Sequence, residues 1–214
     1  MNRPRILLAT NNAGKVRELV VLLAGTPFAV ATPSDEGIAL DVEETGDTFE
    51  ENAVLKARAF AQASGLLSIA DDSGLEVDAL DGEPGVRSAR YAGPDATDED
   101  RVRYLLGKLE DVEWKRRGAR FRSVVALAYP DGEVRLFEGA CEGMVAFEPQ
   151  GDKGFGYDPI FYIPALGRHM AELEMEEKNR MSHRGQAVRR AVEFLGSAEA
   201  LELYGGAETG SRQE

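Results

Sequence analysis

The sequence has few of the residues and segments that stabilise secreted proteins or anchor membrane proteins. It contains one cysteine, Cys141, so no disulfide bond can form within the chain. No apolar run approaches the roughly 20 residues that a membrane-spanning helix needs, and the N-terminus lacks the pattern of a signal peptide. We therefore expect a cytoplasmic protein without a membrane partner.

Positive charge is also scarce. The chain has 25 lysines and arginines against 38 aspartates and glutamates, which gives a formal net charge of -13. Binding to the phosphate backbone of a nucleic acid requires the opposite balance, so we expect no nucleic-acid partner. The basic stretch Lys115–Arg122 is short and local, and its pattern indicates a solvated loop that runs into a strand.

The Walker A pattern GxxxxGK[ST] is absent, but another candidate phosphate site lies near the N-terminus. Arg5–Ala9 (RILLA) is typical of a strand and Lys15–Ala24 of a helix, and the turn Thr10–Lys15 (TNNAGK) joins them. A polar turn that leads into a helix presents backbone N–H groups and the positive end of the helix dipole, and Lys15 adds a full charge. This arrangement can hold a phosphate, although it is also ordinary α/β architecture.

The most informative segment, Leu66–Leu75 (LLSIADDSGL), is an apolar run that changes abruptly into two adjacent carboxylates. The apolar half is typical of a short buried strand, which places Asp71 and Asp72 at the exit of that strand. Adjacent carboxylates repel each other, and Mg²⁺ commonly binds one or two carboxylates together with phosphate oxygens and water. A cation site is one interpretation, and a solvated DDSG turn is the other.

A second acidic segment, residues 35–51, carries eight acids and no lysine or arginine. Within it, Thr48 and Glu51 have the spacing of a capping box, which predicts a helix over Phe49–Phe60. The pair Glu43–Glu44 therefore lies in the loop before the helix, from which a carboxylate can point at a neighbouring strand end. An acidic loop that only favours solubility is the alternative.

The segment Gly154–Pro164 (GFGYDPIFYIP) combines aromatic residues, glycines and one carboxylate. Phe155 or Tyr157 could stack on a planar base, and Asp158 could organise hydrogen bonds at the edge of that base. A strand with core aromatics is the alternative, and it is the structure that we expect for Ile160–Ile163.

The segment EEKNRMSHRGQA, residues 176–187, gathers positive side chains just before or within the first turn of a helix. Ser182 is the expected N-cap of this helix, whose apolar stripe consists of Val188, Ala191, Val192 and Leu195. His183 stands beside Arg184, where it is better suited to donate hydrogen bonds than to pack. A surface histidine is the alternative.

The rest of the pattern predicts a mixed sheet. Thr97–Leu109 is typical of a capped amphipathic helix, and two strand-like runs, Arg120–Tyr129 and Glu133–Ala140, flank a hairpin turn. With 214 residues and 43% hydrophobic content, we expect one α/β domain over residues 1–204. Residues 205–214 have almost nothing to bury, so we expect a mobile tail there.

Taken in order, these segments resemble the Ham1, or inosine triphosphate pyrophosphatase, family. The matching stretches lie between Thr10 and Ala187 and are TNNAGKVREL, EETGDTFEENAVLKA, ADDSGLEVDAL, GVRSARYAG, GFGYDPIF and MSHRGQA. The resemblance implies an α/β fold with a mixed sheet flanked by helices, two lobes with a central substrate cleft, and a homodimer. It also implies an Mg²⁺-dependent enzyme that converts non-standard purine nucleoside triphosphates (ITP, dITP, XTP and dXTP) to the monophosphate and pyrophosphate, which cleanses the nucleotide pool.

The resemblance further implies roles for individual residues. The triphosphate would be bound by Lys56 together with the turn formed by Thr10, Asn11, Asn12, Ala13, Gly14 and Lys15. Glu43 and Asp72 would hold Mg²⁺, and Asp72 would also position or deprotonate the attacking water. Ser73 would contact the substrate beside the metal. The base pocket would be formed by Phe155, Gly156, Tyr157, Asp158, Lys178, His183 and Arg184.

Base selectivity would follow from hydrogen-bond donors in that pocket. Hypoxanthine and xanthine carry an oxygen at position six where adenine carries an amino group, so donors from His183 and Arg184 would favour them by roughly ten- to a hundredfold. Guanine shares that oxygen, so its exclusion depends on its two-amino group. Two other classes stay open here, a nucleotide-binding regulator without hydrolysis and an Mg²⁺-dependent phosphotransferase.

Overall fold

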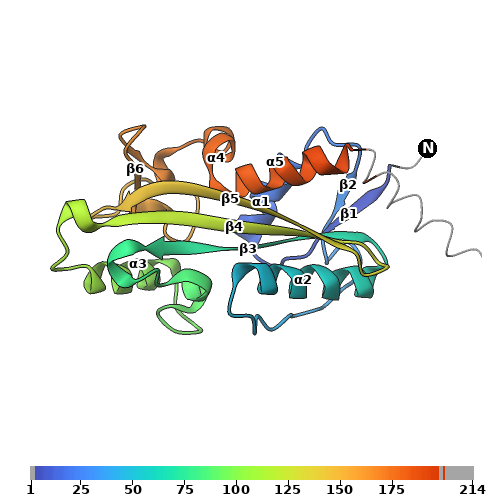
Figure 1. Cartoon of the computed structure of the whole chain (residues 1–214), viewed down its shortest axis with the longest axis horizontal. Coiled ribbons are helices and arrows are strands. Elements are labelled where there is room, and N and C mark those ends of the chain that lie inside the picture. The colour runs from blue at the N-terminus through green and yellow to red at the C-terminus, as the bar shows by residue number, and fades with distance from the viewer. Residues whose placement is uncertain (1–2, 198–199, 201–214) are drawn as a thin grey trace, which may run out of the picture. The chain divides into compact units, whose positions relative to one another are not determined.

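The computed structural model describes residues 3–197 and 200, which form an α/β structure with one mixed sheet (Figure 1). Its seven strands lie in the order β2-β1-β3-β4-β5-β6-β7. Strands β2 and β3 are both parallel to β1, whereas β6 is antiparallel to β5 and to β7. The expected mixed sheet is therefore confirmed. The predicted tail, residues 205–214, lies outside the described residues.

Strands and α-helices alternate in the first part of the chain, whereas β4 is followed directly by β5 and α4 by α5. The strands are β1 (Arg5–Leu8), β2 (Ala29–Ala31), β3 (Leu67–Val77), β4 (Gly118–Ala128), β5 (Val134–Val145), β6 (Phe161–Ile163) and β7 (Arg168–His169). The α-helices are α1 (Ala13–Leu22), α2 (Phe49–Ser64), α3 (Asp98–Lys108), α4 (Met175–Met181) and α5 (His183–Leu195). Short 3-10 helices are η1 (Asp78–Leu80), η2 (Gly85–Arg90), η3 (Trp114–Arg116), η4 (Asp158–Ile160) and η5 (Met170–Glu172).

Contacts divide the chain into two compact units, and each unit has its own hydrophobic core. Among the described residues, the first unit comprises residues 3–72, 124–138, 187–197 and 200, and the second comprises residues 73–123 and 139–186. The division passes through β3, β4 and β5, so these strands contribute residues to both units. The prediction of a single domain over residues 1–204 stays a prediction.

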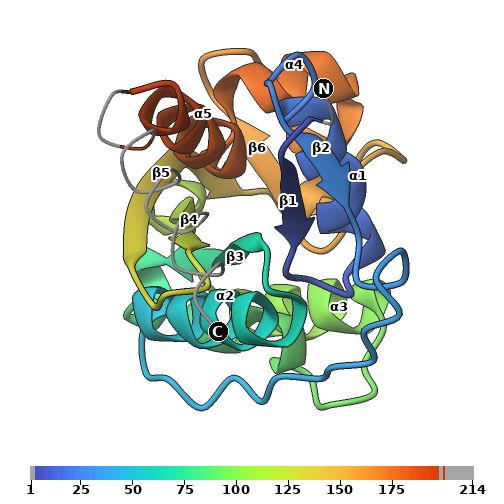
Figure 2. The same cartoon turned by 90° about the vertical axis from the view of Figure 1, so that its right-hand side faces the viewer.

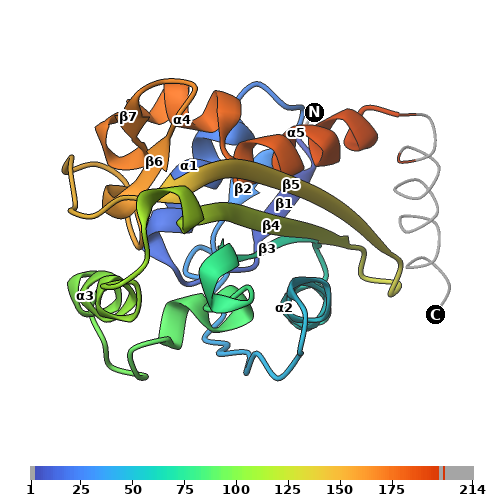
Figure 3. The same cartoon turned by 60° about the vertical axis from the view of Figure 1, so that its left-hand side comes forward.

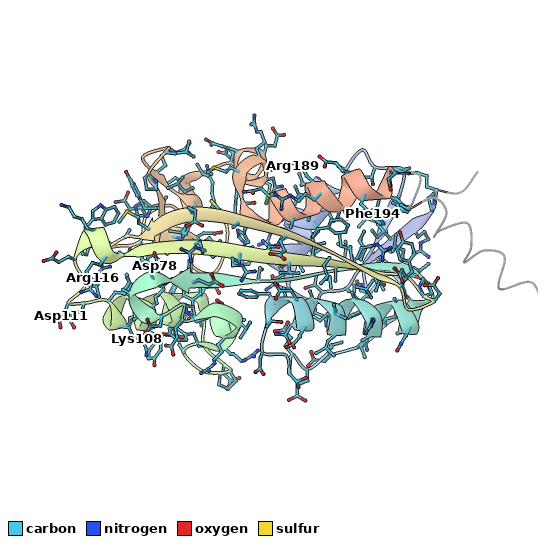
Figure 4. All side chains as sticks on the ribbon, viewed as in Figure 1. Asp78, Lys108, Asp111, Arg116, Arg189 and Phe194 are labelled. Atoms are coloured by element: carbon cyan, nitrogen blue, oxygen red, sulfur yellow. The ribbon has the colours of Figure 1, made fainter. Side chains whose placement is uncertain are left out.

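The first unit buries its part of the sheet on both faces, which explains the apolar character of β1. Figure 1 shows α2 on one side of these strands and the C-terminal part of α5 on the other, and Figure 2 shows β1 and β2 side by side near α1. Strands covered on both faces have no polar face to present, so they are nearly continuously hydrophobic. Phe194 of α5, labelled in Figure 4, packs its ring 5.5 Å from that of Phe137. The core includes Ile6, Leu8, Leu19, Leu23, Leu67, Ile69, Val125, Leu127, Val188 and Ala191.

The second unit forms its core between α3, the strands and the short elements that follow β5. Figure 3 shows α3 nearly end-on, on the side of β4 and β5 opposite to α4. The predicted inward positions of α3 are confirmed, since Val102, Leu105 and Leu109 belong to this core with Leu106 packed against it. The strand with core residues expected over Ile160–Ile163 is confirmed in part: Ile160, Phe161 and Ile163 are buried, but Tyr162 is only half-buried and Ile160 belongs to η4 and not to β6.

An aromatic group at the surface of the second unit surrounds the single tryptophan. The ring of Trp114 lies 5.9 Å from the ring of Phe147 and 5.6 Å from that of Tyr162. The guanidinium carbon of Arg117 lies 4.1 Å from the centre of the Phe147 ring. Trp114 nevertheless keeps 36% of its surface exposed.

The helix starts follow the local sequence closely. Thr48 and Glu51 form the predicted capping box of α2, and Thr97 forms one with Asp100 at the start of α3. Ser182 Oγ accepts a hydrogen bond from the Gly185 N–H at 3.1 Å, which confirms Ser182 as the cap of α5. A side-chain acceptor at this position satisfies an N–H group that the helix itself leaves unpaired.

The strand that contains the paired aspartates is longer than predicted. β3 continues through Asp71 and Asp72 to Val77, and the two residues are 0% and 4% exposed. The interpretation of DDSG as a solvated turn is therefore wrong, and so is the end of the strand before Asp71. The carboxylates are tolerated inside a buried strand because each one is paired with a lysine, as described below.

None of the helices in the described ranges is both long enough and apolar enough to cross a lipid bilayer.

Candidate active site

The predicted phosphate turn lies between β1 and α1 in the first unit. Asn12 is the N-cap of α1, and its Oδ1 accepts a hydrogen bond from the Lys15 N–H at 3.0 Å. Thr10 Oγ1 accepts one from the Asn12 N–H at 3.1 Å, and Asn11 Nδ2 donates to the Leu40 carbonyl at 3.0 Å. The polar side chains of the turn therefore fix its backbone at the positive end of α1, which is a favourable position for an anion.

Two lysines converge on the paired aspartates of β3. Lys15 Nζ lies 2.8 Å from Asp71 Oδ2, and Lys56 Nζ lies 2.7 Å from Asp72 Oδ1. Both ammonium groups also donate to the same oxygen, the main-chain carbonyl of Asp71, at 3.0 Å each. The turn before α1 and the middle of α2 are therefore joined, through their lysines, at one point of β3.

The alternation of side chains along a strand explains this arrangement. Successive residues of a strand point to opposite faces of the sheet, so Asp71 and Asp72 cannot share one partner on one face. Asp71 is paired with the lysine at the start of α1, and Asp72 is paired with the lysine of α2. Each buried carboxylate thus has its own counter-charge.

Burial changes the ionisation of this cluster. Desolvation raises the pKa of Asp72, although the charges of Lys56 and Lys15 act in the opposite direction. Burial by itself lowers the pKa of Lys56, but the charges of Asp72 and Glu44 outweigh it, and the pKa of this lysine is raised overall. A buried carboxylate with a raised pKa beside a permanently charged lysine is typical of a group that accepts a proton.

The acidic loop contributes Glu44 to the cluster. Glu44 Oε1 lies 2.5 Å from Lys56 Nζ, whereas the neighbouring Glu43 is exposed. The loop is fastened by the buried Asn52, which accepts from the Gly46 N–H at 2.8 Å and donates to the Gly46 carbonyl at 3.3 Å. The preceding carboxylates are thereby held above the same helix that carries Lys56. The acidic segment is thus an ordered part of the cluster in addition to any effect on solubility.

The acidic side chains of this cluster are candidate ligands for the Mg²⁺ ion that the family resemblance implies. Within residues 3–197 and 200, no group of three or more His, Cys, Asp or Glu side chains is already arranged around a possible ion. The acidic groups near Lys56 are carboxylates, and hard oxygen donors of this kind fit Mg²⁺ better than a soft metal. The residues that would hold the ion are Asp72 and a glutamate of the acidic loop. The assignment of Glu43 to the ion stays a prediction.

Two residues of this cluster, Asp71 and Glu44, were absent from the set of site residues that the sequence predicted. The sequence did indicate a role for Asp71, because two adjacent acids in an apolar run each need a cation. Two lysines that could supply it, Lys15 and Lys56, lie in earlier motifs of the same family resemblance. No local pattern distinguishes Glu44 from Glu43, since the two are adjacent in an irregular loop.

In the second unit, the predicted base-binding segment forms a tight loop before η4. Asp158 Oδ2 accepts hydrogen bonds from the Phe155 N–H at 2.9 Å and from Lys178 Nζ at 2.5 Å. Gly154 has a φ of 78°, and a Cβ atom at this position would lie 2.0 Å from Asp158 Oδ2. Only glycine therefore allows the loop to close over the buried Asp158 carboxylate.

Predicted site residues from two other segments lie near Phe155. Lys178 Nζ lies 5.0 Å from the centre of the half-buried Phe155 ring, and the guanidinium carbon of Arg184 lies 5.5 Å from it. Arg184 is 1% exposed, and its Nη2 donates to Ser73 Oγ at 2.7 Å. The structure therefore brings Ser73, Phe155, Asp158, Lys178 and Arg184 together, with an aromatic ring and several donors in one place. Ser73, which was expected beside the metal, is bonded to Arg184 of the expected base pocket.

His183 occupies a different environment from the one expected. Its ring stacks on that of Phe121, with a centre-to-centre distance of 4.7 Å and an interplanar angle of 14°. The side chain is 4% exposed, so the alternative of a surface histidine is wrong. The ring packs on Phe121 of β4, a neighbour that the local sequence could not indicate, and the expected role of His183 as a hydrogen-bond donor stays a prediction.

The candidate site residues thus form two clusters, one in each unit. The first unit carries the turn Thr10–Lys15, the acidic loop, Lys56 and the paired aspartates, and the second carries the loop around Phe155 with Ser73 and Arg184. Asp72 is the last residue of its segment in the first unit, and Ser73 is the first residue of the second. The chain itself therefore links the two clusters.

Comparisons with known proteins match nearly the whole chain. A family profile described as the Ham1 family matches residues 6–194. The "dITP/XTP pyrophosphatase" of Halalkalibacterium halodurans is 48% identical over 189 residues, which are 88% of this chain and 97% of that protein. The structure of the Staphylococcus aureus Ham1 protein has 46% identity and a TM-score of 0.79, and covers 89% of this chain and 97% of its own. A HAM1 protein from Coxiella burnetii has 43% identity and a TM-score of 0.81, with 90% and 98% covered.

Proposed function

The chain belongs to the Ham1 family, and we propose that it hydrolyses non-standard purine nucleoside triphosphates to the monophosphate and pyrophosphate. The proposed substrates are ITP, dITP, XTP and dXTP, because relatives at about 50% identity are named dITP/XTP pyrophosphatase. Removal of these nucleotides would cleanse the nucleotide pool of the cell. The family also supports a homodimer and a cytoplasmic location as parts of this proposal.

One observation carries the proposal for this chain, namely the convergence of Lys15 and Lys56 on the carbonyl oxygen of Asp71. Two fixed ammonium groups beside the N-terminus of α1 can donate hydrogen bonds to phosphate oxygens in addition to their carboxylate partners, and hydrolysis of a triphosphate needs charge stabilisation and alignment more than covalent chemistry. The adjacent Asp72 supplies a carboxylate with a raised pKa at the same place. Binding of the phosphates and activation of a water can therefore occur side by side.

Within this proposal, the residues of the first unit act on the phosphates. The turn Thr10–Lys15 and Lys56 bind the triphosphate, and Asp72 orients the attacking water and accepts its proton. Glu43 and Asp72 are the residues that would hold Mg²⁺. The ion, when bound, supplies positive charge to the phosphate oxygens and the leaving pyrophosphate. The lysines are also in place to compensate the charge that develops on the leaving group.

The residues of the second unit select the base. Phe155 offers a ring face for stacking, and Arg184, His183 and Lys178 are donors that suit the oxygen at position six of hypoxanthine and xanthine. Adenine would place an amino donor against those donors. A mismatch of this kind costs about 1 to 3 kcal/mol for each unsatisfied group, which supports a preference of roughly ten- to a hundredfold.

Product analysis tests this function directly. The purified protein is incubated with Mg²⁺ and, in separate reactions, with inosine, xanthosine, adenosine or guanosine triphosphate. We expect the monophosphate and pyrophosphate from the first two and little product from the others. Release of a diphosphate and phosphate would overturn the assigned bond. Transfer of phosphate to an added acceptor would indicate a phosphotransferase, and binding without turnover would indicate a regulator.

A further inference from the structure

One motif of the family resemblance, GVRSARYAG over Gly85–Gly93, has no role in the function proposed above. Its centre, Ser88, is 7% exposed and makes three hydrogen bonds within the second unit. Ser88 Oγ accepts from the Leu75 N–H at 2.9 Å and donates to the Gly85 carbonyl at 2.6 Å. The Ser88 carbonyl accepts a hydrogen bond from the Tyr157 hydroxyl at 3.0 Å. The motif therefore connects β3, two residues after Ser73, to the loop that contains Phe155.

A second contact to the same loop comes from the first turn of α3. Asp98 Oδ2 accepts a hydrogen bond from the Gly156 N–H at 2.7 Å. The other carboxylate oxygen of Asp98 forms an ion pair with Arg101, whose Nη1 donates to the Ala89 carbonyl at 2.9 Å and to the Ala96 carbonyl at 2.6 Å. Arg101 thus orients Asp98 and joins it to the GVRSARYAG segment.

These contacts hold the two residues that the loop cannot fix by itself. Asp158 secures the Phe155 N–H from inside the loop, whereas the Gly156 N–H and the Tyr157 hydroxyl are bonded to Asp98 and Ser88. Gly156 has a φ of 63°. A glycine backbone adopts positive and negative φ values about equally well, so the residue itself does not favour this conformation. The position of the Phe155 ring therefore depends on acceptors that lie far away in the sequence.

Helix capping does not explain the orientation of Asp98. Thr97 is the N-cap of α3 and Asp100 completes its capping box, so the helix start is satisfied without Asp98. An acid in the first turn also interacts favourably with the helix dipole, but Glu99 can do so equally well. The hydrogen bond to Gly156 is the contact that distinguishes Asp98 from its neighbours.

We propose that Asp98, oriented by Arg101, is a positioning residue that fixes the base-binding loop and thereby controls affinity and selectivity for the purine base. This inference rests on the proposed function, because it assigns the loop around Phe155 to the base. The contacts of Asp98 and Arg101 described above all lie within the second unit, so we assign Asp98 to binding of the nucleoside and not to cleavage of the triphosphate.

The test compares Asp98→Ala with Asp98→Asn and with the matched control Glu99→Ala. Asp98→Ala loses a hydrogen bond to a charged acceptor, so we expect it to raise the KM for ITP about tenfold. We expect kcat to change by no more than about twofold. Asp98→Asn keeps an oxygen acceptor for the Gly156 N–H and should recover most of the affinity. Glu99→Ala removes the same charge from the same turn and should match the wild type.

Inhibition by inorganic triphosphate separates a base effect from a general one. This probe has no base, so its inhibition constant should be the same in Asp98→Ala and in the wild type. Tyr157→Phe removes only the bond to Ser88 and should raise the KM for ITP in the same direction. An unchanged KM in Asp98→Ala, equal effects of Asp98→Ala and Glu99→Ala, or equally weakened inhibition by inorganic triphosphate would each overturn the inference.

Direct binding of inosine monophosphate, measured by calorimetry, distinguishes failure of the inference from failure of the proposed function. If the wild type does not hydrolyse ITP, the proposed function fails, but weaker binding of the monophosphate to Asp98→Ala would still support the inference. Equal binding to both proteins would overturn it. If the wild type neither hydrolyses ITP nor binds the monophosphate, both fail. Should Asp98→Ala not fold, Asp98→Asn and Tyr157→Phe carry the same comparison.

Discussion

The ammonium nitrogen of Lys56 lies 2.7 Å from Oδ1 of Asp72, and only 8% and 4% of these two residues are exposed. A long lysine side chain held in this way has lost most of its rotamer entropy before any ligand binds. The pair therefore offers a fixed positive group next to a fixed negative one, and changes to it should affect the chemistry more than the fold.

The substitution Asp72→Asn should lower kcat for ITP by roughly a hundred- to ten-thousandfold, because the amide keeps the shape of the side chain but cannot accept the proton of the attacking water. Pyrophosphate release measures the rate, and circular dichroism measures the fold. Asp47→Asn removes the same charge from an exposed position of the acidic segment and should leave kcat unchanged. Near-normal turnover in Asp72→Asn would remove Asp72 from both the metal and the water roles.

Lys15→Ala should raise the KM for ITP by about ten- to a hundredfold, because it removes a charged donor from the phosphate turn. Steady-state kinetics with saturating Mg²⁺ provide the measurement. If kcat fell and the KM stayed constant, the contact of Lys15 would belong to the transition state and not to the bound substrate.

The same substitution should also destabilise the first unit. Lys15→Ala leaves the fully buried carboxylate of Asp71 without its counter-charge, which typically costs about 3 to 5 kcal/mol in the free energy of unfolding. The double variant Lys15→Ala with Asp71→Asn removes the buried charge and should recover part of this loss. Urea unfolding of both proteins provides the comparison, and additive effects of the two substitutions would contradict the coupling.

Arg184→Ala should narrow the preference for ITP over ATP by about tenfold, because it removes a donor from the base site. The ratio of kcat/KM for the two substrates gives the answer. Ser73→Ala is the matched control for the hydrogen bond between these residues, since it leaves the guanidinium in place. An unchanged ratio in Arg184→Ala would assign recognition of the base to other residues.

Burial raises the pKa of the Cys141 thiol to about 11, compared with about 8.5 for an exposed thiol. The thiolate is the reactive form, so iodoacetamide at about pH 8 should alkylate the native protein at least a hundredfold more slowly than the urea-unfolded chain. The native rate should rise about tenfold for each pH unit up to about pH 10. The thiol keeps its proton to a higher pH in the folded protein than in the unfolded chain. Its ionisation therefore lowers the free energy of unfolding as the pH rises from about 8.5 toward 11. Equal native and unfolded rates, measured by mass spectrometry, would contradict the raised pKa.

Features fixed by neighbouring residues could be predicted from the sequence. The capping boxes at Thr48 and Thr97 need only a partner three residues away, and both are present. The hairpin between β4 and β5 needs only its turn, and the Gly132 N–H does bond to the Tyr129 carbonyl. In each case the stabilising contact lies within the window that the pattern describes.

Features that depend on distant partners could not be predicted. Lys15 is 56 positions from Asp71, so the residues near DDSG indicated a need for a cation but not which lysine would pair with each carboxylate or that the strand would continue through them. The environment of His183 depends on Phe121, and that of Gly156 depends on Asp98, 58 positions away. The family resemblance named most of the candidate site residues, but it did not indicate which contacts hold them in position.

The position of Trp114 provides an intrinsic optical probe. It is the single tryptophan of the chain, it belongs to the second unit, and its indole packs against Phe147 and Tyr162 while it stays partly in contact with solvent. Its emission spectrum therefore reports the integrity of the second unit alone. Comparison of that signal with far-ultraviolet circular dichroism during denaturation would show whether the two units lose their structure in one transition or in two.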